Sequence, residues 1–447
     1  MRRLLFLPLL FACYTISKAQ TLQENFKRNV STLASDRFEG REASTPADTL
    51  SAKYIAAEFA KIKGVQLLGD KGLQQVIYKD KKSIQSASMK VGRKALTLNE
   101  SFIPAIASTS GDFSGETIFL GFGAADDYTN QSLEGKYILV TEGVKKGTKS
   151  MSINDKALLA IKANAAGLIV IEDAKKVSKK DVTRPTLTPA SDKSLFIAKV
   201  NNKVGAQLKK GASFTASVQT HMAEKHTHNV VARLNALKEN NPEGKTVVIG
   251  AHYDHMGYEM IDGEKVICRG ADDNASGIAT IIEFARRYAQ LVPAMQRDII
   301  FIAFGAEEKG LKGSAYYASN PLDSLSNCVG MVNFDMTGRM KAKGITIRGL
   351  GSAHQAIPMF SLLPNKDELE IVWEMRGAGP TDYSSFYKKG VPAFSFSTRL
   401  HSDYHTPRDT EEEVNYEGME MMFNYVTNLI NRLVIETVQL TVKPDRQ

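Results

Sequence analysis

Histidine and carboxylate residues recur in the C-terminal half of the chain, in short segments that could hold metal ions. The series is His252-Tyr253-Asp254, Asp272-Asp273, Glu307-Glu308, Asp335 and Tyr404-His405. Imidazole and carboxylate are the ligands that zinc takes in sites with an open coordination position, and a carboxylate can bridge two ions. The residue types therefore predict an enzyme with a two-metal centre.

The spacing of these residues distinguishes metal ligands from the residues that hold the ligands in place. Alternation along a strand would place His252 and Asp254 on one face, so we expect His252 as a ligand and Asp254 behind it, holding the second imidazole nitrogen. The adjacent carboxylates Glu307 and Glu308 repel each other in a confined place unless a cation or a proton lies between them. Helix capping explains one aspartate of the pair Asp272-Asp273 more easily than two.

The elements that must position these residues have the pattern of buried parallel strands alternating with helices. Strands are expected at 229–234, 246–250, 298–304, 328–334 and 393–397, and the clearest helix is expected at 276–288. Ligands of such sheets bind beyond the C-terminal ends of the strands. The metal-binding segments follow several of these ends, so the sequence predicts an α/β fold with a mixed, mainly parallel sheet sandwiched by helices.

The N-terminal half of the chain has a different pattern of apolar residues. Apolar residues at helical spacing predict helices at 22–33 and 47–62, and β-rich runs then follow from about residue 88 to residue 221. Within these runs, a helix at 156–167 leads into a strand at 168–171. This strand, helix, Ala-Ala-Gly and strand order resembles the protease-associated (PA) domain, over roughly residues 91–219. An unrelated β-rich insertion is the alternative.

The metal-binding segments, taken in their order, resemble the M28 family of di-zinc peptidases over roughly residues 229–433. The resemblance implies a zinc-exopeptidase-like fold and two Zn²⁺ ions per chain. It implies that His252 and Asp335 hold one ion, that Glu308 and His405 hold the other, and that Asp273 bridges them. Glu307 would be the general base acting on a metal-bridging hydroxide, and Tyr404 would steady the developing oxyanion. Asp272 stays outside this ligand set.

The same resemblance implies a peptide substrate and exopeptidase activity, most readily that of an aminopeptidase. A carboxypeptidase on the same scaffold remains an alternative, with Arg376 or Arg399 as candidates to bind a terminal carboxylate. Glutaminyl cyclisation is a further alternative, but it would use one zinc ion, and the full set of five candidate ligands argues against it. A noncatalytic peptide-binding or receptor-like module is the alternative from another class of protein.

Other histidines and the cysteines carry less weight. His255, His401 and the cluster at 221–228 are expected at the surface or behind the ligands. After removal of a leader, Cys268 and Cys328 are the remaining cysteines, and neither has the CxxC spacing of a zinc knot. Whether these two cysteines pair is left open.

The first residues have the layout of a secretory signal peptide. Met1-Arg2-Arg3 precedes the apolar run 4–12, and small or polar residues then lead to Ala19. We therefore expect export to the periplasm or beyond, with cleavage near Ala19. The alternative is a lipoprotein, because Leu10-Phe11-Ala12-Cys13 is similar to a lipobox and would leave a lipid-modified Cys13. No stretch reaches the about 20 apolar residues of a transmembrane helix.

Length, composition and charge indicate the number of domains and the class of partner. The chain has 447 residues, of which 43% are hydrophobic and 24% are charged, as in a globular protein of two domains. Subtracting Arg2, Arg3 and Lys18 from the formal charge of +8 leaves +5. The basic clusters lack interleaved aromatic residues, so no nucleic-acid partner is expected. The predicted organisation is a signal peptide (1–19), an N-terminal helical part of the catalytic domain (20–90), a PA-like inserted domain (91–225), the catalytic domain (226–438) and a C-terminal tail (439–447).

Overall fold

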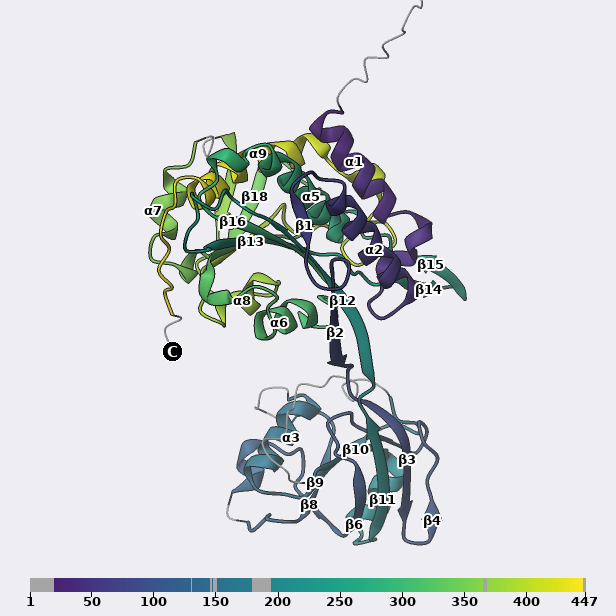
Figure 1. The fold of residues 1–447 in the computed structure, drawn as a ribbon. Coiled ribbons are helices and arrows are strands. Elements are labelled where there is room, and N and C mark those ends of the chain that lie inside the picture. Colours follow the sequence, from purple (N-terminus) through teal and green to yellow (C-terminus); the bar gives the residue numbers. More distant parts are fainter. Residues whose placement is uncertain are drawn as a thin grey trace, which may run out of the picture. The chain divides into compact units, whose positions relative to one another are not determined.

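The computed structural model describes residues 20–129, 131–144, 147, 151–178, 194–364 and 368–444. The chain divides into two compact units, one up to Tyr78 and from Lys225 onward, the other over Lys79–Glu224 (Figure 1). The expected boundary at residue 91 is therefore wrong. Strand β3 (Ser83–Val91) belongs to the second unit, because it pairs along its length with β11 (Phe214–His221). The expected leader, with Cys13, lies outside the described residues.

A nine-stranded sheet runs through the first unit, in the order β1-β12-β16-β13-β17-β20-β18-β19, with β2 also paired to β12. The central pairs β16–β13, β13–β17 and β17–β20 are parallel, whereas β12 meets β16 and β18 meets β20 in antiparallel fashion. This confirms the predicted mixed, mainly parallel sheet. The strands are β1 (Val65–Leu67), β2 (Leu73–Lys79), β12 (Glu224–Leu234), β13 (Thr246–His252), β16 (Asp298–Phe304), β17 (Cys328–Phe334), β18 (Gly344–Arg348), β19 (Glu370–Trp373) and β20 (Ala393–Ser397).

Helices cover both faces of this sheet (Figure 1). One face carries α1 (Leu22–Leu33), α2 (Pro46–Ala60), α5 (Gly277–Ala289) and α9 (Tyr416–Val434), and the other carries α6 (Lys312–Ser319) and α8 (Tyr383–Tyr387). The short helix α7 (Ala356–Ser361) precedes β19. The first helix starts where Thr21 and Glu24 form a capping box, which satisfies free backbone N–H groups.

Alternating side chains of the central strands divide the interior into two cores. Along β13, Val247 and Ile249 pack into the core beneath α1, α2, α5 and α9, whereas Val248 packs into the core on the α6 and α8 side. Because both faces are covered, the strand is apolar at nearly every position. This burial leaves the carboxyl edge of the sheet as the place where polar side chains can gather.

The second unit holds a five-stranded sheet in the order β5-β10-β9-β8-β7 and a four-stranded sheet in the order β4-β3-β11-β6. The expected strand–helix–strand step is present, since β8 and β9 are parallel neighbours joined through α3. The remaining elements of this unit are β4 (Lys94–Ala95), β5 (Phe102–Pro104), β6 (Gly111–Gly115), β7 (Thr117–Phe119), β8 (Tyr137–Thr141), α3 (Ile153–Lys162), β9 (Gly167–Glu172), β10 (Phe196–Asn201) and α4 (Asn202–Lys209).

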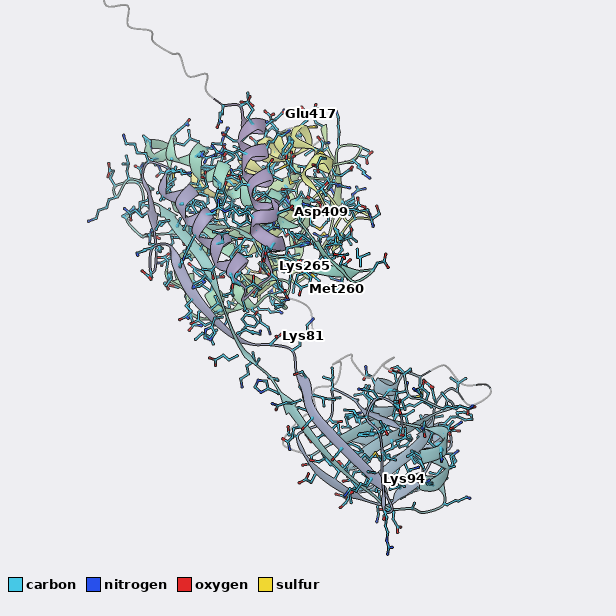
Figure 2. All side chains as sticks on the ribbon, turned by 90° about the vertical axis from the view of Figure 1, so that its right-hand side faces the viewer. Lys81, Lys94, Met260, Lys265, Asp409 and Glu417 are labelled. Atoms are coloured by element: carbon cyan, nitrogen blue, oxygen red, sulfur yellow. The ribbon has the colours of Figure 1, made fainter. Side chains whose placement is uncertain are left out.

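A surface hairpin, the two cysteines and the character of the helices remain to be described. A hairpin of β14 (Tyr258–Ile261) and β15 (Glu264–Ile267) lies at the surface of the first unit, where Met260 is 62% exposed (Figure 2). Cys268 and Cys328 are buried and unpaired with each other. Among the described residues, no helix has the length and apolar character needed to cross a membrane.

Candidate metal centre

The carboxyl ends of three neighbouring strands bring histidine and carboxylate side chains together. His252 is the last residue of β13, and Asp335 directly follows β17. Glu307 and Glu308 follow β16 after a two-residue turn. Asp273 lies in the turn of the chain before α5. The loop before α9 contributes His405, so residues far apart in the sequence converge on one site.

The first ligand group consists of His252, Asp273 and Asp335, all of them buried. His252 Nε2 lies 3.3 Å from Asp273 Oδ1 and 3.4 Å from Asp335 Oδ1. These are two carboxylates and one imidazole, the donor types of an open zinc site. The group supplies three protein atoms and leaves a fourth tetrahedral position free.

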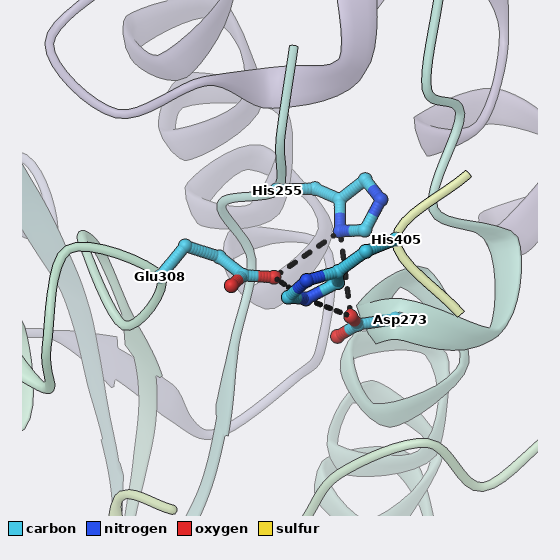
Figure 3. Close-up of side chains that lie close together, drawn as sticks. All are labelled: His255, Asp273, Glu308 and His405. Carbon is cyan, nitrogen blue, oxygen red and sulfur yellow. Dashed lines mark hydrogen bonds and ion pairs between the residues drawn. The ribbon is translucent and has the colours of Figure 1, made fainter. Parts of the chain in front are cut away.

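The second ligand group consists of His255, Asp273, Glu308 and His405 (Figure 3). His255 Nδ1 lies 3.3 Å from Glu308 Oε1 and 3.5 Å from Asp273 Oδ2. His405 Nε2 lies 2.9 Å from Glu308 Oε1 and 3.2 Å from Asp273 Oδ2. This group therefore offers four protein atoms, one more than the first.

The sequence predicted that His255 lies at the surface or behind the ligands. The structure contradicts both expectations, because the side chain is fully buried and offers a ligand atom to the second group. Strand β13 ends at His252, so strand alternation no longer predicts where residue 255 points. The backbone N–H of His255 instead donates to the carbonyl of Arg41, and this bridge holds the residue against the site. The available signal was the second histidine three positions after the first.

The spacing of these donor atoms fits two tetrahedral zinc ions. Zinc binds nitrogen and oxygen at about 2.0–2.2 Å, so donors around one tetrahedral ion lie about 3.3–3.6 Å apart. The four distances from His252 and His255 are 3.3–3.5 Å and lie in this range, whereas those from His405 Nε2 are shorter, at 3.2 Å and 2.9 Å. Asp273 turns Oδ1 to one group and Oδ2 to the other, as a bridging carboxylate would. His255 Nδ1 and Asp273 Oδ2 are also buried without a hydrogen bond among the described residues, which fits ligation.

Electrostatics point to a missing positive charge. Burial raises the pKa of Glu307 well above its ordinary value, and the charge of His252 offsets only part of this. Although burial lowers it, the pKa of His405 rises to about 10 through hydrogen bonds with Asp273 and Glu308. Both pKa shifts favour the form that reduces the negative charge of the site, the protonated carboxyl of Glu307 and the charged imidazole of His405. Divalent cations would supply the missing positive charge directly.

Asp254 anchors the turn that carries the glutamates. Its carboxylate accepts the backbone N–H groups of Glu307 at 2.8 Å and of Glu308 at 3.2 Å. His252 Nδ1 lies 3.2 Å from the backbone carbonyl oxygen of Asp254 and 3.9 Å from its carboxylate. The expected support of the imidazole therefore comes from the main chain, because the strand ends before Asp254 and the two side chains no longer share a strand face.

Arg41 is a positioning residue that the sequence did not reveal. Its guanidinium is fully buried and donates hydrogen bonds of 2.7–2.8 Å to backbone carbonyls on both sides of the site, those of Tyr253, Arg269 and Gly270. It thereby ties the turn after β13 to the turn before α5. Nothing in the sequence around residue 41 indicates this role, because the partners lie more than 200 positions away.

Asp272 faces away from the ligand groups. Its Oδ2 lies 3.2 Å from His401 Nε2, and its Oδ1 accepts the backbone N–H of Gly338. The buried carboxylate of Asp409, labelled in Figure 2, accepts the backbone N–H groups of Asp272 and Asp273 at 3.0–3.1 Å. Asp409 therefore orients the bridging aspartate through the main chain. Its sequence signal was weak, a further acid shortly after His405.

A pocket of about 220 Å³ opens onto both ligand groups, and Glu307 and Tyr404 line it. Glu307 belongs to neither ligand group, so its carboxylate is free for another task. The ring of Tyr404 stacks on that of His405 with 3.7 Å between centroids. Arg376 and Arg399 are exposed and lie outside this lining.

Comparisons with known proteins agree with this geometry. The pattern of Peptidase family M28 matches residues 229–430. Aminopeptidase YwaD of Bacillus subtilis is 24% identical over 335 residues, which cover 72% of this chain and 67% of that protein. A protein named Probable zinc metalloprotease from Pyrenophora tritici-repentis is 34% identical, but over 115 residues that cover 26% of each chain.

Solved structures share the fold. The aminopeptidase from Aneurinibacillus sp. strain AM-1 superposes with a TM-score of 0.59 at 22% identity, covering 95% of this chain and 96% of that one. The zinc aminopeptidase BSAP from Bacillus subtilis gives a TM-score of 0.57 at 21% identity, covering 96% of this chain and all (100%) of the other. The similarity therefore extends over both compact units.

Proposed function

We propose that this chain is an exported aminopeptidase of the M28 type with two zinc ions per chain. It would release single residues from the N-terminus of peptides. The match of the Peptidase family M28 pattern to residues 229–430 and the similarity to an aminopeptidase and to a probable zinc metalloprotease support this proposal. The observation that carries this proposal is Asp273, whose two oxygens each face a separate group of histidine and carboxylate donors at tetrahedral spacing.

Three residues in or beside the pocket have a task in this reaction in addition to the metal ligands, namely Glu307, Asp254 and Tyr404. Two bound zinc ions would polarise the scissile carbonyl and acidify the attacking water. Glu307 accepts the proton of that water and hands it to the leaving nitrogen, because its carboxylate lies in the pocket but outside both ligand groups. Asp254 holds the Glu307 main chain in place for this transfer. Tyr404, stacked on His405, is positioned to donate its hydroxyl to the developing oxyanion.

Attack at the N-terminus is supported by the charge of the pocket. A free α-amine is a cation, and four carboxylates line the cavity beside a single arginine, those of Asp273, Glu307, Glu308 and Asp335, so the negative charge of the lining favours a cationic end of the peptide. The cations proposed for a carboxypeptidase, Arg376 and Arg399, are exposed outside it. A carboxypeptidase on the same scaffold is the second candidate, favoured by a different arginine that does line the pocket, Arg348.

The proposal also covers the N-terminal residues and the inserted unit. The basic and apolar layout of residues 1–19 supports export. The unit Lys79–Glu224 is proposed to be a PA-like insertion, because it contains the strand–helix–strand step β8–α3–β9. It supplies none of the ligand atoms in the two groups.

The test compares aminoacyl arylamides that have a free amine with matched N-acetylated peptides that have a free C-terminus, each with and without a chelator. Chelator-sensitive release from the free-amine substrates alone is expected, with about two zinc ions per chain. Release from the blocked peptides alone would replace the proposal by a carboxypeptidase. Absence of both hydrolysis and bound metal would leave a noncatalytic binding module.

A further inference from the structure

A single arginine lines the pocket beside the metal-binding side chains. Arg348 is the last residue of β18, which pairs in antiparallel register with β20, so that Arg348 lies opposite Ser395. Ser397 of the same strand also lines the pocket. The arginine is thus carried by a strand of the central sheet, and its backbone position is fixed by the sheet register.

Among the described residues, the guanidinium of Arg348 forms no ion pair with a carboxylate of the metal centre. Its ion-pair partner is Glu374, with Nε 3.3 Å from Oε2, and Glu374 is not a lining residue. The side chain of Arg348 is 16% exposed and that of Glu374 is 46% exposed. Apart from this ion pair, the guanidinium of Arg348 donates no side-chain hydrogen bond to any residue in the described part of the chain. A guanidinium has five N–H donors in a planar fork, so most of its capacity remains available.

An arginine with spare donors in an enclosed pocket suits a carboxylate. The fork matches the two oxygens of a carboxylate, and partial burial strengthens the contact. The pocket's own carboxylates are engaged in the ligand groups or reserved for proton transfer, as Asp273, Glu308 and Glu307 show. The donors of Arg348 that Glu374 leaves unused are therefore open to a carboxylate that comes with the substrate.

We propose that Arg348 forms a subsite for a carboxylate of the substrate, located within one residue of the scissile bond. This inference rests on the proposed peptidase function. The volume of about 220 Å³ lies below the roughly 300–1,000 Å³ of pockets for drug-sized ligands, which limits the occupant to about one residue. The carboxylate belongs either to the side chain of an acidic N-terminal residue or to the free C-terminus of a dipeptide.

The experiment uses two matched substrate pairs with the full-length zinc-loaded protein. Glutamyl arylamide against glutaminyl arylamide tests the side-chain source, and Ala-Ala against Ala-Ala-amide tests the C-terminal source. In one pair the wild-type protein prefers the carboxylate member. Arg348→Met lowers kcat/KM for that member by roughly 10- to 100-fold, since hydrogen bonds to charged groups contribute on this scale, and lowers it less for the neutral member.

Two variants separate substrate binding from a structural role. Glu374→Gln removes the ion-pair partner but leaves the guanidinium, so hydrolysis of the carboxylate substrate is expected to be unchanged or faster. Arg376→Met removes an exposed arginine of the following loop and is expected to have no effect. If Glu374→Gln reproduces the loss seen in Arg348→Met, the arginine only supports the loop and the proposal is overturned.

The inference and the proposed function can fail separately. Equal hydrolysis of both members of both pairs by the wild-type protein overturns the carboxylate subsite and leaves the peptidase intact. If no substrate is hydrolysed, the proposed function fails, and calorimetric titration with glutamate and with glutamine then decides the subsite. Tighter binding of glutamate that is lost in Arg348→Met supports the subsite, and equal binding of the two amino acids excludes it.

Discussion

Replacing His255 by alanine tests whether the second ligand group has four protein ligands. The imidazole is fully buried, and its Nδ1 lies 3.3 Å from Glu308 Oε1 and 3.5 Å from Asp273 Oδ2. Tetrahedral zinc requires about 3.3–3.6 Å between its donors. The histidine thus already occupies the position of a fourth ligand, and its removal leaves Asp273, Glu308 and His405.

The size of the effect follows from that geometry. Loss of a residue behind the ligands typically weakens metal binding 10- to 100-fold, and loss of a ligand should exceed that range. We expect one of the two zinc ions to bind more than about a hundredfold more weakly in His255→Ala, which corresponds to a loss above about 2.8 kcal/mol. The other ion, at His252 and Asp335, should be affected less, because it shares only Asp273 with the altered group.

The assay is zinc content after equilibrium dialysis against a graded chelator, measured for the wild-type protein and three variants. His252→Ala should weaken the opposite ion, and His401→Ala serves as a control, because His401 contacts Asp272 rather than a ligand group. Co²⁺ substitution gives a second readout, since a change from four protein ligands to three alters its visible spectrum. Zinc retention by His255→Ala equal to that of the wild type, or equal to that of His401→Ala, would refute the reasoning.

Two further predictions follow from the structure. Glu307→Gln should keep both zinc ions, because Glu307 is in neither ligand group, while turnover falls by about 10²- to 10⁴-fold; undiminished turnover would remove Glu307 as the base. Burial raises the pKa of Asp48 in the fold above its ordinary value, so the proton is bound more tightly in the folded state and stability is lost as pH rises from about 4 toward that raised pKa. Denaturation of metal-free protein at pH 4 and pH 7 should therefore show the wild type losing more stability than Asp48→Asn, and parallel losses would contradict this.

The sequence determined the framework of the catalytic unit. Long apolar runs predicted strands that the structure places at 224–234, 246–252, 298–304, 328–334 and 393–397. This worked because strands buried on both faces are apolar at nearly every position. Ligand candidates directly after such strands, among them His252 and Asp335, were identifiable for the same reason. Where a strand begins with polar residues the prediction fell short, since β12 starts at Glu224 rather than at residue 229.

In the turns that follow the strands, where side chains have no regular periodicity, only the tertiary structure decided which way each residue points. Strand alternation predicted that the carboxylate of Asp254 holds His252 Nδ1, and the two lie 3.9 Å apart. Because the strand ends before Asp254, the hydrogen bonds of this carboxylate come from the backbone N–H groups of the two glutamates. His255 lies in the same turn, and its burial at the site had no periodic signal. The unit boundary at residue 79 rather than 91 likewise depends on pairing of β3 with a strand more than a hundred residues away.

The sequence by itself therefore determined the strands of the central sheet and the chemical types of the metal ligands, because both depend on residues close together in the chain. Only the tertiary structure decided that Arg41 ties two turns together, that Asp409 orients Asp273, and that Arg348 lines the pocket. Each of these roles depends on a contact across distant parts of the chain. Such contacts are fixed by the packing of the whole unit, and no local pattern of residues records them.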